Sequence, residues 1–305
     1  MLKRLFSSNT TRFVAGAFVL IGLVLAIPAT RALADELLNL FRIEQVTVIP
    51  VDFTGLQELT GSDALGKQFT SLVSSSITMT QKPGAPIDVT DANDASQKTG
   101  FTVRLPQNLT PSRISVLNAS AFNITIDRTK AQALLDESGR SDLVLPDSID
   151  GALISVTVPS SVQAAYGTCP DPSAADSTKS GTPGRNYPDC VMLSEIPSPT
   201  VNAPASVDVS QLAQIGLEFT GMTSDQAAAF TSSIDWTSTL VVPIPKNAAT
   251  YEQLPVDGVI GTLIQRPADD APQYVLLWIK DGIVYSIGGL GSNSQQALDM
   301  ANSMP

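Results

Sequence analysis

The segment from Gly61 to Gln68 (GSDALGKQ) has almost the spacing of a phosphate-binding loop. In the motif G-x-x-x-x-G-K-[ST], backbone N–H groups and the lysine surround the phosphates, and the last hydroxyl reaches Mg²⁺. Here Gln68 stands where the hydroxyl is needed, and Asp63 would place a carboxylate beside the phosphates. We therefore interpret this match as a coincidence beside the start of a helix.

Histidine is absent from all 305 residues, and only two cysteines are present. Ser-His-Asp and Cys-His catalysis, histidine metal sites and four-thiolate metal sites are therefore excluded. The 29 acidic residues still allow a hydrolase that uses two carboxylates, although aromatic residues, which often form the walls of sugar clefts, make up only 6%. The composition predicts a protein that is not an enzyme and has no catalytic residues, cofactor or metal.

The N-terminal region predicts contact with a membrane. Residues 13–29 are apolar and uncharged, and Lys3, Arg4 and Arg12 precede them. A stretch of seventeen residues is at the short limit for a membrane-spanning helix and is long for the apolar part of a signal peptide. The sequence therefore predicts one membrane anchor or signal helix over residues 13–34.

Two interpretations of this helix stay open. As an anchor it would be retained, with residues 1–12 in the cytoplasm, and we favour this because helix-forming residues continue through Phe41. As a signal peptide it would be cleaved after Ala34 and the protein secreted. Both interpretations place residues 35–305 outside the cytoplasm, because the basic cluster stays on the inner side.

The charge of the outer part disfavours binding to nucleic acid. The chain has 18 basic and 29 acidic residues, and four of the basic ones lie in the first 34 positions. The remaining 14 basic residues against 29 acidic ones give the outer part a net charge of about −15. Polyanions such as nucleic acid, and anionic lipid headgroups, would be repelled.

Cys169 and Cys190 enclose a segment rich in proline, glycine, serine and threonine. Two cysteines in one segment outside the cytoplasm predict a disulfide. A redox-active pair is the alternative, but it would require the C-x-x-C spacing. Because strands are predicted on both sides of the segment, we expect it to connect neighbouring antiparallel strands.

Apolar residues recur with two periods along residues 35–305, every second position for strands and every third or fourth for helices. Strands are predicted over 42–52, 100–106, 113–119, 120–127, 151–159, 162–167, 191–196, 256–267, 273–280 and 283–290. Helices are predicted over 65–73, 90–98, 128–138, 209–219, 224–234 and 293–304. This mixture predicts an α+β fold of antiparallel sheets with packed helices, behind one N-terminal membrane or signal helix.

Several positions predict how these elements begin or join. Asp127 and Ser292 are expected to cap helices, and Thr223 with Gln226 forms a capping box. The dipeptide Asp281-Gly282 predicts a tight hairpin, because a type I′ turn needs positive φ at both positions.

Two expectations concern pairing and domains. The adjacent strands 113–119 and 120–127 are expected to pair with each other. Residues 35–305 form one extracytoplasmic domain, which could consist of two packed halves joined around the 169–190 loop.

Four segments resemble a known family: GFTVRLP (100–106), WIKDGIVYSIGG (278–289), ALDMANSM (297–304) and the juxtamembrane stretch 37–52. The chain resembles, over most of residues 33–305, a bacterial extracytoplasmic domain family of unknown function. Such domains often form the outer, C-terminal part of membrane-bound anti-sigma factors. The last strands and helix also resemble, more distantly, lipoprotein carriers, in which a curved antiparallel sheet holds apolar ligands.

The resemblance implies a sensing or partner-binding role outside the membrane, linked to signalling at the cell envelope. Because only residues 1–12 are predicted to lie inside, we expect no sigma-binding domain. The preferred interpretation is a membrane-tethered interaction or sensory domain with a protein partner. The alternative is a carrier for an apolar ligand. Its candidate lining residues, for which we favour simple core packing, are Phe230, Val275, Leu277, Ile283 and Tyr285.

Overall fold

A computed structural model describes residues 43–52, 63–169, 189–267, 273–291 and 293–305. The predicted membrane or signal helix lies outside these ranges, as does the start of the phosphate-loop match. Within the described ranges, no helix has the length and apolar character required to cross a bilayer.

The described residues form antiparallel sheets with packed helices, which confirms the predicted α+β class. The strands are β1 (Gln45–Val51), β2 (Ile77–Gln81), β3 (Ile87–Val89), β4 (Arg113–Leu117), β5 (Ser120–Thr125), β6 (Leu153–Val158), β7 (Ser161–Tyr166), β8 (Val191–Pro197), β9 (Thr200–Asn202), β10 (Thr239–Pro245), β11 (Thr250–Val256), β12 (Val259–Arg266), β13 (Gln273–Lys280) and β14 (Ile283–Leu290). The helices are α3 (Asp63–Ser76), α4 (Ala92–Thr99), α5 (Arg128–Glu137), α7 (Val209–Phe219), α8 (Ser224–Ser233) and α9 (Ser294–Asn302), with a short 3₁₀ turn, η2 (Asp147–Ile149).

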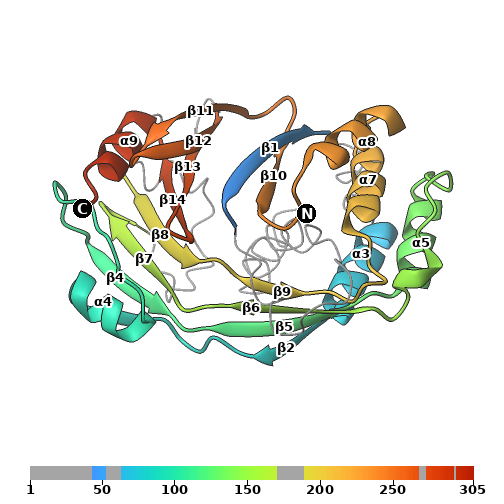
Figure 1. The fold of residues 1–305 in the computed structure, drawn as a ribbon, viewed down its shortest axis with the longest axis horizontal. Coiled ribbons are helices and arrows are strands. Elements are labelled where there is room, and N and C mark those ends of the chain that lie inside the picture. Colours follow the sequence, from blue (N-terminus) through green and yellow to red (C-terminus); the bar gives the residue numbers. More distant parts are fainter. Residues whose placement is uncertain (1–42, 53–62, 170–188, 268–272, 292) are drawn as a thin grey trace.

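Two antiparallel sheets are built in part from the same long strands. The large sheet has the order β11-β12-β13-β14-β8-β7-β4-β3, and the small sheet has the order β2-β5-β6-β9. Each strand of the small sheet continues into one of the last four strands of the large sheet, in the same order, so four long strands bend from one sheet into the other (Figure 1). The third unit is a parallel pair, β1 with β10, which lies inside the arch of the sheets.

Prolines at the bend explain why the hydrogen bonds between neighbouring strands are interrupted there. Pro159 separates β6 from β7, and Pro199 separates β8 from β9. Proline has no N–H to donate, so it interrupts a sheet ladder. Between β4 and β5 the Ala119 N–H donates to the Ser160 hydroxyl at 3.1 Å instead of to a neighbouring strand.

The expectation that residues 113–119 and 120–127 pair with each other is therefore wrong. They form β4 and β5, which are two parts of one bent strand. β4 pairs with β3 and β7, while β5 pairs with β2 and β6. The two residues between them carry the chain from one sheet into the other instead of turning it back in a hairpin.

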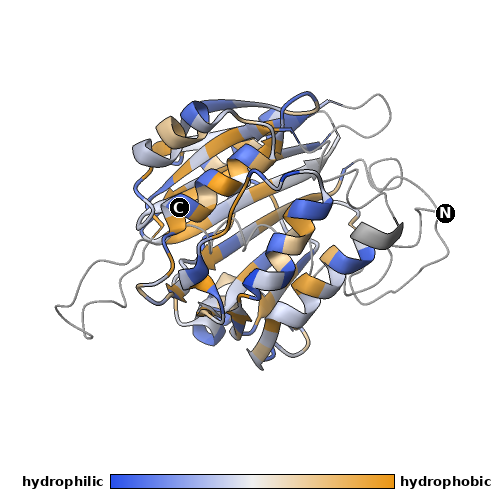
Figure 2. Cartoon of the chain, turned by 90° about the vertical axis from the view of Figure 1, so that its right-hand side faces the viewer, coloured by the Kyte–Doolittle hydropathy of each residue, from blue (hydrophilic) through white to orange (hydrophobic). Residues whose placement is uncertain are grey.

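Each sheet has its own hydrophobic core. One face of the large sheet packs against α4 and α9, and the small sheet packs against α7 and Trp236. A third, smaller cluster joins the parallel pair to the opposite face of the large sheet through Ile43, Leu240, Ile279 and Val284. Figure 2 shows hydrophobic residues concentrated along the strands and mixed with hydrophilic residues on the helices, as surface helices require.

Most local signals are confirmed. The Lys130 N–H donates to the carboxylate of Asp127 at 3.0 Å, and the capping box of Thr223 and Gln226 is formed in both directions. The last helix is capped by Asn293 and not by Ser292, which lies outside the described residues. The Gln296 N–H donates to the side-chain oxygen of Asn293. Asparagine caps a helix as serine does, and Asn293 lies one residue nearer the helix than Ser292.

The predicted strand 256–267 is wrong at its start. Asp257 and Gly258 have φ angles of 52° and 79°, and they form a hairpin turn between β11 and β12. This is the same Asp-Gly turn that was predicted at Asp281-Gly282, where the φ angles of 53° and 75° confirm it. The periodicity hid the first turn because valines precede and follow it.

The predicted strand 100–106 is also wrong. This segment follows α4 but joins no sheet. Its backbone groups are bound by side chains: the Val103 N–H donates to the Ser96 hydroxyl at 2.9 Å, and the Arg104 N–H donates to both carboxylate oxygens of Glu195. A strand-like sequence can remain outside a sheet when side chains satisfy its donors.

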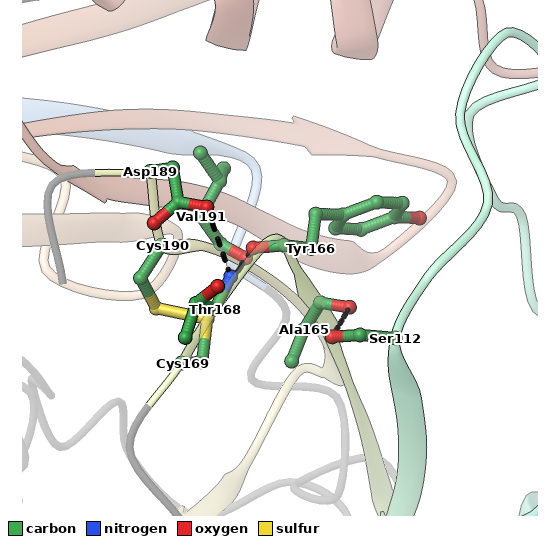
Figure 3. The surroundings of a disulfide bond; sticks show 8 residues. All are labelled: Ser112, Ala165, Tyr166, Thr168, Cys169, Asp189, Cys190 and Val191. Carbon is green, nitrogen blue, oxygen red and sulfur yellow. Dashed lines mark hydrogen bonds between the residues drawn. A yellow bond between two sulfur atoms is a disulfide. The ribbon is translucent and has the colours of Figure 1, made fainter.

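Cys169 and Cys190 form the predicted disulfide at the ends of β7 and β8 (Figure 3). The two strands are antiparallel neighbours, as expected, with Tyr166 opposite Val191. The chain turns out of β7 at Gly167, which has a φ angle of 73°. A Cβ atom there would lie 2.3 Å from the Asp189 carbonyl oxygen, so only glycine allows the two ends to approach this closely.

The disulfide should stabilise the folded protein chiefly by shortening the unfolded chain. Closing a loop with a sequence separation of 21 corresponds to about 3 kcal/mol on the chain-entropy estimate. We expect the double substitution Cys169→Ala/Cys190→Ala to lower the free energy of unfolding in urea by about that amount. Reduction of the wild-type protein should have the same effect and should leave the double variant unchanged. A double variant as stable as the oxidised wild type would contradict this account.

Candidate functional site

A buried cluster of charges lies at the end of the large sheet, around the Asp257-Gly258 turn. The Asp257 side chain is 5% exposed and accepts two hydrogen bonds from the Arg104 guanidinium, at 2.6 and 2.7 Å. Lys280 donates to the same carboxylate at 2.7 Å and to the Asp257 carbonyl at 2.9 Å. The indole N–H of Trp278 donates to it at 3.1 Å. One carboxylate thus joins three separate segments of chain.

A second carboxylate lies deeper in the same cluster. Glu195 occupies an inward position of β8 and is completely buried. Tyr285 of β14 lies opposite it on one side, and Val162 of β7 on the other. Its carboxylate oxygens accept only the N–H of Arg104, at 3.1 and 3.2 Å, among the hydrogen bonds of the described residues.

The aromatic rings of the cluster complete the surroundings of the Arg104 side chain. Its guanidinium carbon lies 5.5 Å from the ring centre of Tyr285, a cation–π distance, and the Tyr285 ring stacks on Trp278 with centres 5.1 Å apart. The Arg104 Nε atom donates to the carbonyl of Pro305 at 2.6 Å, so the same side chain also holds the segment after α9.

The two carboxyl groups have opposite electrostatic environments. Burial raises the pKa of Glu195 to about 8, although the Arg104 N–H and charge oppose this. Burial also acts to raise the pKa of Asp257, but hydrogen bonds from Arg104, Lys280 and Trp278 lower it overall. Near neutral pH Asp257 is therefore charged and paired, while Glu195 is protonated.

This cluster holds separate parts of the fold together, and its carboxyl groups are enclosed or occupied. Glu195 is fully enclosed, and the Asp257 carboxylate is already occupied by three donors. Neither carboxyl group stands in a cleft, as the two-carboxylate hydrolase would require. Within the described ranges, no three metal-ligating side chains gather at one place.

An open groove lies on the other face of the same strands. It has a volume of about 330 Å³ and runs between the start of β1 and the hairpin of β11 and β12. Its lining combines apolar and uncharged polar side chains with a single carboxylate. The lining residues are Glu44, Gln45, Val46, Thr47, Gln253, Val259, Ile260, Thr262 and Ile279.

Part of the groove wall is an exposed apolar surface. Ile260 is 64% exposed, and it lies two residues from Thr262 on the same face of β12. Tyr251 and Val275, which are 45% and 37% exposed, extend this face across the neighbouring strands through Ile264. Residues of this size that are exposed together are typical of contact surfaces.

A second cavity is smaller and more apolar. It has a volume of about 180 Å³ and lies between α3, α5 and the end of β5. Its apolar lining residues are Leu72, Val73, Ile77, Ile126 and Ala131. This volume is below the roughly 300 Å³ at which small-molecule sites begin.

The five predicted lining residues do not surround one cavity. Val275 and Leu277 point to the groove face of β13, because Leu276 between them is buried in the core. Ile283 packs against the opposite core and Tyr285 is buried in it, while Phe230 lies on α8. None of them lines either cavity described above.

The residues that form the charged cluster were not singled out by sequence. The detectable signals were an Asp-Gly dipeptide at 257–258 and a glutamate at 195, where the alternation of β8 calls for an apolar residue. Arg104 carried no signal, because an arginine in an extended segment is ordinarily exposed.

Comparison with known proteins leaves the family open. No family model, no curated protein and no solved structure matches this chain.

The role of the Asp257 ion pairs can be tested by comparing substitutions in two Asp-Gly turns of the same geometry. Asparagine adopts positive φ as readily as aspartate, so Asp257→Asn keeps the turn but removes the charge that pairs with Arg104 and Lys280. Because this leaves two cations without a buried partner, we expect a loss of about 3–5 kcal/mol in the free energy of unfolding. Asp281→Asn, in the exposed turn of the same geometry, should change it by less than about 0.5 kcal/mol. Equal effects of both substitutions would contradict the role of the pairing.

Glu195 predicts a pH dependence of stability. Its pKa is raised from 4.5 to about 8, so between these values the folded chain keeps a proton that the unfolded chain releases. The free energy of unfolding should therefore fall as the pH rises through this window, by at most about 1.4 kcal/mol per pH unit.

Glu195→Gln should remove this slope, because glutamine does not titrate but still offers an oxygen to the Arg104 N–H. Urea unfolding from pH 5 to pH 8 measures the effect. Glu252→Gln, at an exposed position of β11, is the control and should keep the wild-type slope. A slope that persists in Glu195→Gln would show that another group causes it.

Proposed function

We propose that residues 35–305 form a membrane-tethered domain outside the cytoplasm that binds a protein partner of the cell envelope and catalyses no reaction. The observation that carries this proposal is the groove between β1 and the β11–β12 hairpin. It is open, it adjoins an exposed apolar surface, and Glu44 is the one ionisable residue among those that line it. Such a lining can bind a partner, whereas acid–base chemistry commonly uses a second positioned group.

The location outside the cytoplasm is supported by the disulfide and by the N-terminal sequence. A buried Cys190 joined to Cys169 across two paired strands is typical of proteins that fold in an oxidising compartment. The apolar stretch 13–29 with basic residues before it is typical of segments that direct the following chain across a membrane. The proposed relation to the outer domains of anti-sigma factors depends on the sequence resemblance alone.

The alternative function, a carrier for an apolar ligand, has less support. The carrier would need a connected apolar cavity large enough for a ligand. The more apolar of the two cavities has only about 180 Å³, and the larger one is lined by several polar side chains. A sensory role remains part of the preferred proposal, because binding of the partner would be the event that the domain senses.

Site-specific photocrosslinking in intact membranes tests the interaction. A photoreactive amino acid at Ile260 would lie in the groove, and one at Val144, which is 63% exposed, would lie far from it in sequence and outside both cavities. We expect a discrete crosslinked protein from position 260 and none from position 144. The same product from both positions, or no product from any exposed position of the large sheet, would contradict the proposal. The intact mass of the extracted protein shows in the same preparation whether residues 1–34 are retained.

A further inference from the structure

β1 presents an edge to the groove. Four consecutive residues, 44–47, line it. Successive side chains of a strand point to opposite faces, so a cavity that touches all four must lie beside the strand and not over one face. The other edge of β1 is bound to β10 in parallel register, from Gln45 opposite Thr239 to Val51 opposite Pro245.

The free edge of β1 leaves backbone groups available for pairing. In the part of the chain that the structure describes, no other strand pairs with β1. A strand with one neighbour directs about half of its N–H and C=O groups to the open side, which makes such an edge a template for another strand. The Gln45 N–H donates to the Ser238 carbonyl at 3.2 Å, and the Glu44 N–H donates to it at 2.8 Å. The alternation of a parallel ladder therefore directs the Val46 N–H and C=O to the open edge, along which residues 44–47 span about 13 Å.

The opposite wall of the groove offers contacts for alternate side chains. Gln253 and Thr262 form a cross-strand pair, and Ile260 lies beside them on the same face. Ile279 of β13 closes the groove beyond them. A strand that pairs with β1 would therefore place every second side chain on a surface that is partly apolar and partly hydrogen-bonding.

Charge and chain length indicate the kind of strand that fits. Glu44 is exposed at one end of the groove, and the outer part of the chain has a net charge of about −15, so a second copy would be repelled and a basic segment attracted. Glu44 lies ten positions after Ala34, the predicted membrane boundary, and ten positions span at most about 35 Å. The groove therefore lies within reach of segments just outside the membrane.

We propose that this groove binds an extended, membrane-proximal segment of a partner protein, which adds as a strand to the free edge of β1 and carries apolar residues beside a lysine or arginine. The inference depends on the proposed function and specifies its partner and binding mode. Backbone hydrogen bonds to the open edge of β1, centred on Val46, supply affinity, and the alternating contacts with Ile260, Gln253 and Thr262 supply selectivity.

A peptide panel tests the binding mode on the full-length protein in detergent. The probes are hexapeptides of alternating valine or isoleucine and threonine with a lysine or arginine at each end. We expect binding measured by fluorescence anisotropy together with slower amide hydrogen exchange, by about tenfold or more, in residues 44–49. Peptides with alternate amides N-methylated should fail to bind, because they lose the donors that a strand needs. Glutamate at both ends should weaken binding by about tenfold.

Two variants locate the contact. Glu44→Gln should weaken the binding of the lysine peptides by about fivefold and leave a peptide with uncharged ends unaffected. Val144→Glu, at an exposed position that lines neither cavity, should change the affinity for the uncharged peptide by less than twofold. Protection of β11 or β3 in place of β1, equal binding of the N-methylated peptides, or no binding across the panel would overturn the inference.

The outcome separates this inference from the proposed function. If photocrosslinking in membranes identifies a partner on another surface while the peptides do not protect β1, the domain binds proteins but not by strand addition. If the peptides protect β1 but no protein is crosslinked in membranes, the groove has the proposed chemistry and the proposed function is wrong.

Discussion

The four strands that bend from the large sheet into the small one constrain every other part of the structure. Because β4, β7 and β8 belong to one core while their continuations β5, β6 and β9 belong to the other, neither sheet can form its ladder without the other (Figure 1). The two hydrophobic cores are therefore linked by continuous strands. Cys169 and Cys190 lie at the ends of β7 and β8 that are opposite the bend.

The charged cluster has a different role, because it binds a segment that the hydrogen bonds between strands do not hold. The segment 100–106 has no strand partner, and it is held by Arg104, whose backbone binds Glu195 and whose side chain binds Asp257. The cluster contains two cationic and two carboxyl groups, and protonation of Glu195 leaves it with one excess positive charge at neutral pH. The Arg104 guanidinium lies over the ring of Tyr285, which itself stacks on Trp278, and the face of an aromatic ring stabilises a cation.

Sequence reasoning predicted what depends on local patterns and missed what depends on distant partners. The caps at Asp127 and Thr223, the turn at Asp281-Gly282 and the disulfide each require residues close in sequence or unique in type, and all were found. The bend between β4 and β5 was read as a hairpin, because period-two alternation does not show which strand lies alongside. The charged cluster joins residues 104, 195, 257 and 280, which no local pattern relates. The groove forms between β1 and a hairpin more than 200 positions later, and only the fold brings these two segments together.

The pairing of β1 with β10 also sets an order of assembly. Gln45 and Thr239, which are joined by a side-chain hydrogen bond and by strand register, are 194 positions apart. A ribosome produces the chain from its N-terminus, so β1 is synthesised long before β10, with the small sheet and the strands β3, β4, β7 and β8 between them. Since a parallel contact of such separation is among the slowest to close, we expect β1 to pair late in folding. Until β10 is available, both edges of β1 lack this neighbour, and a chaperone or another chain can meet the strand before the protein is complete.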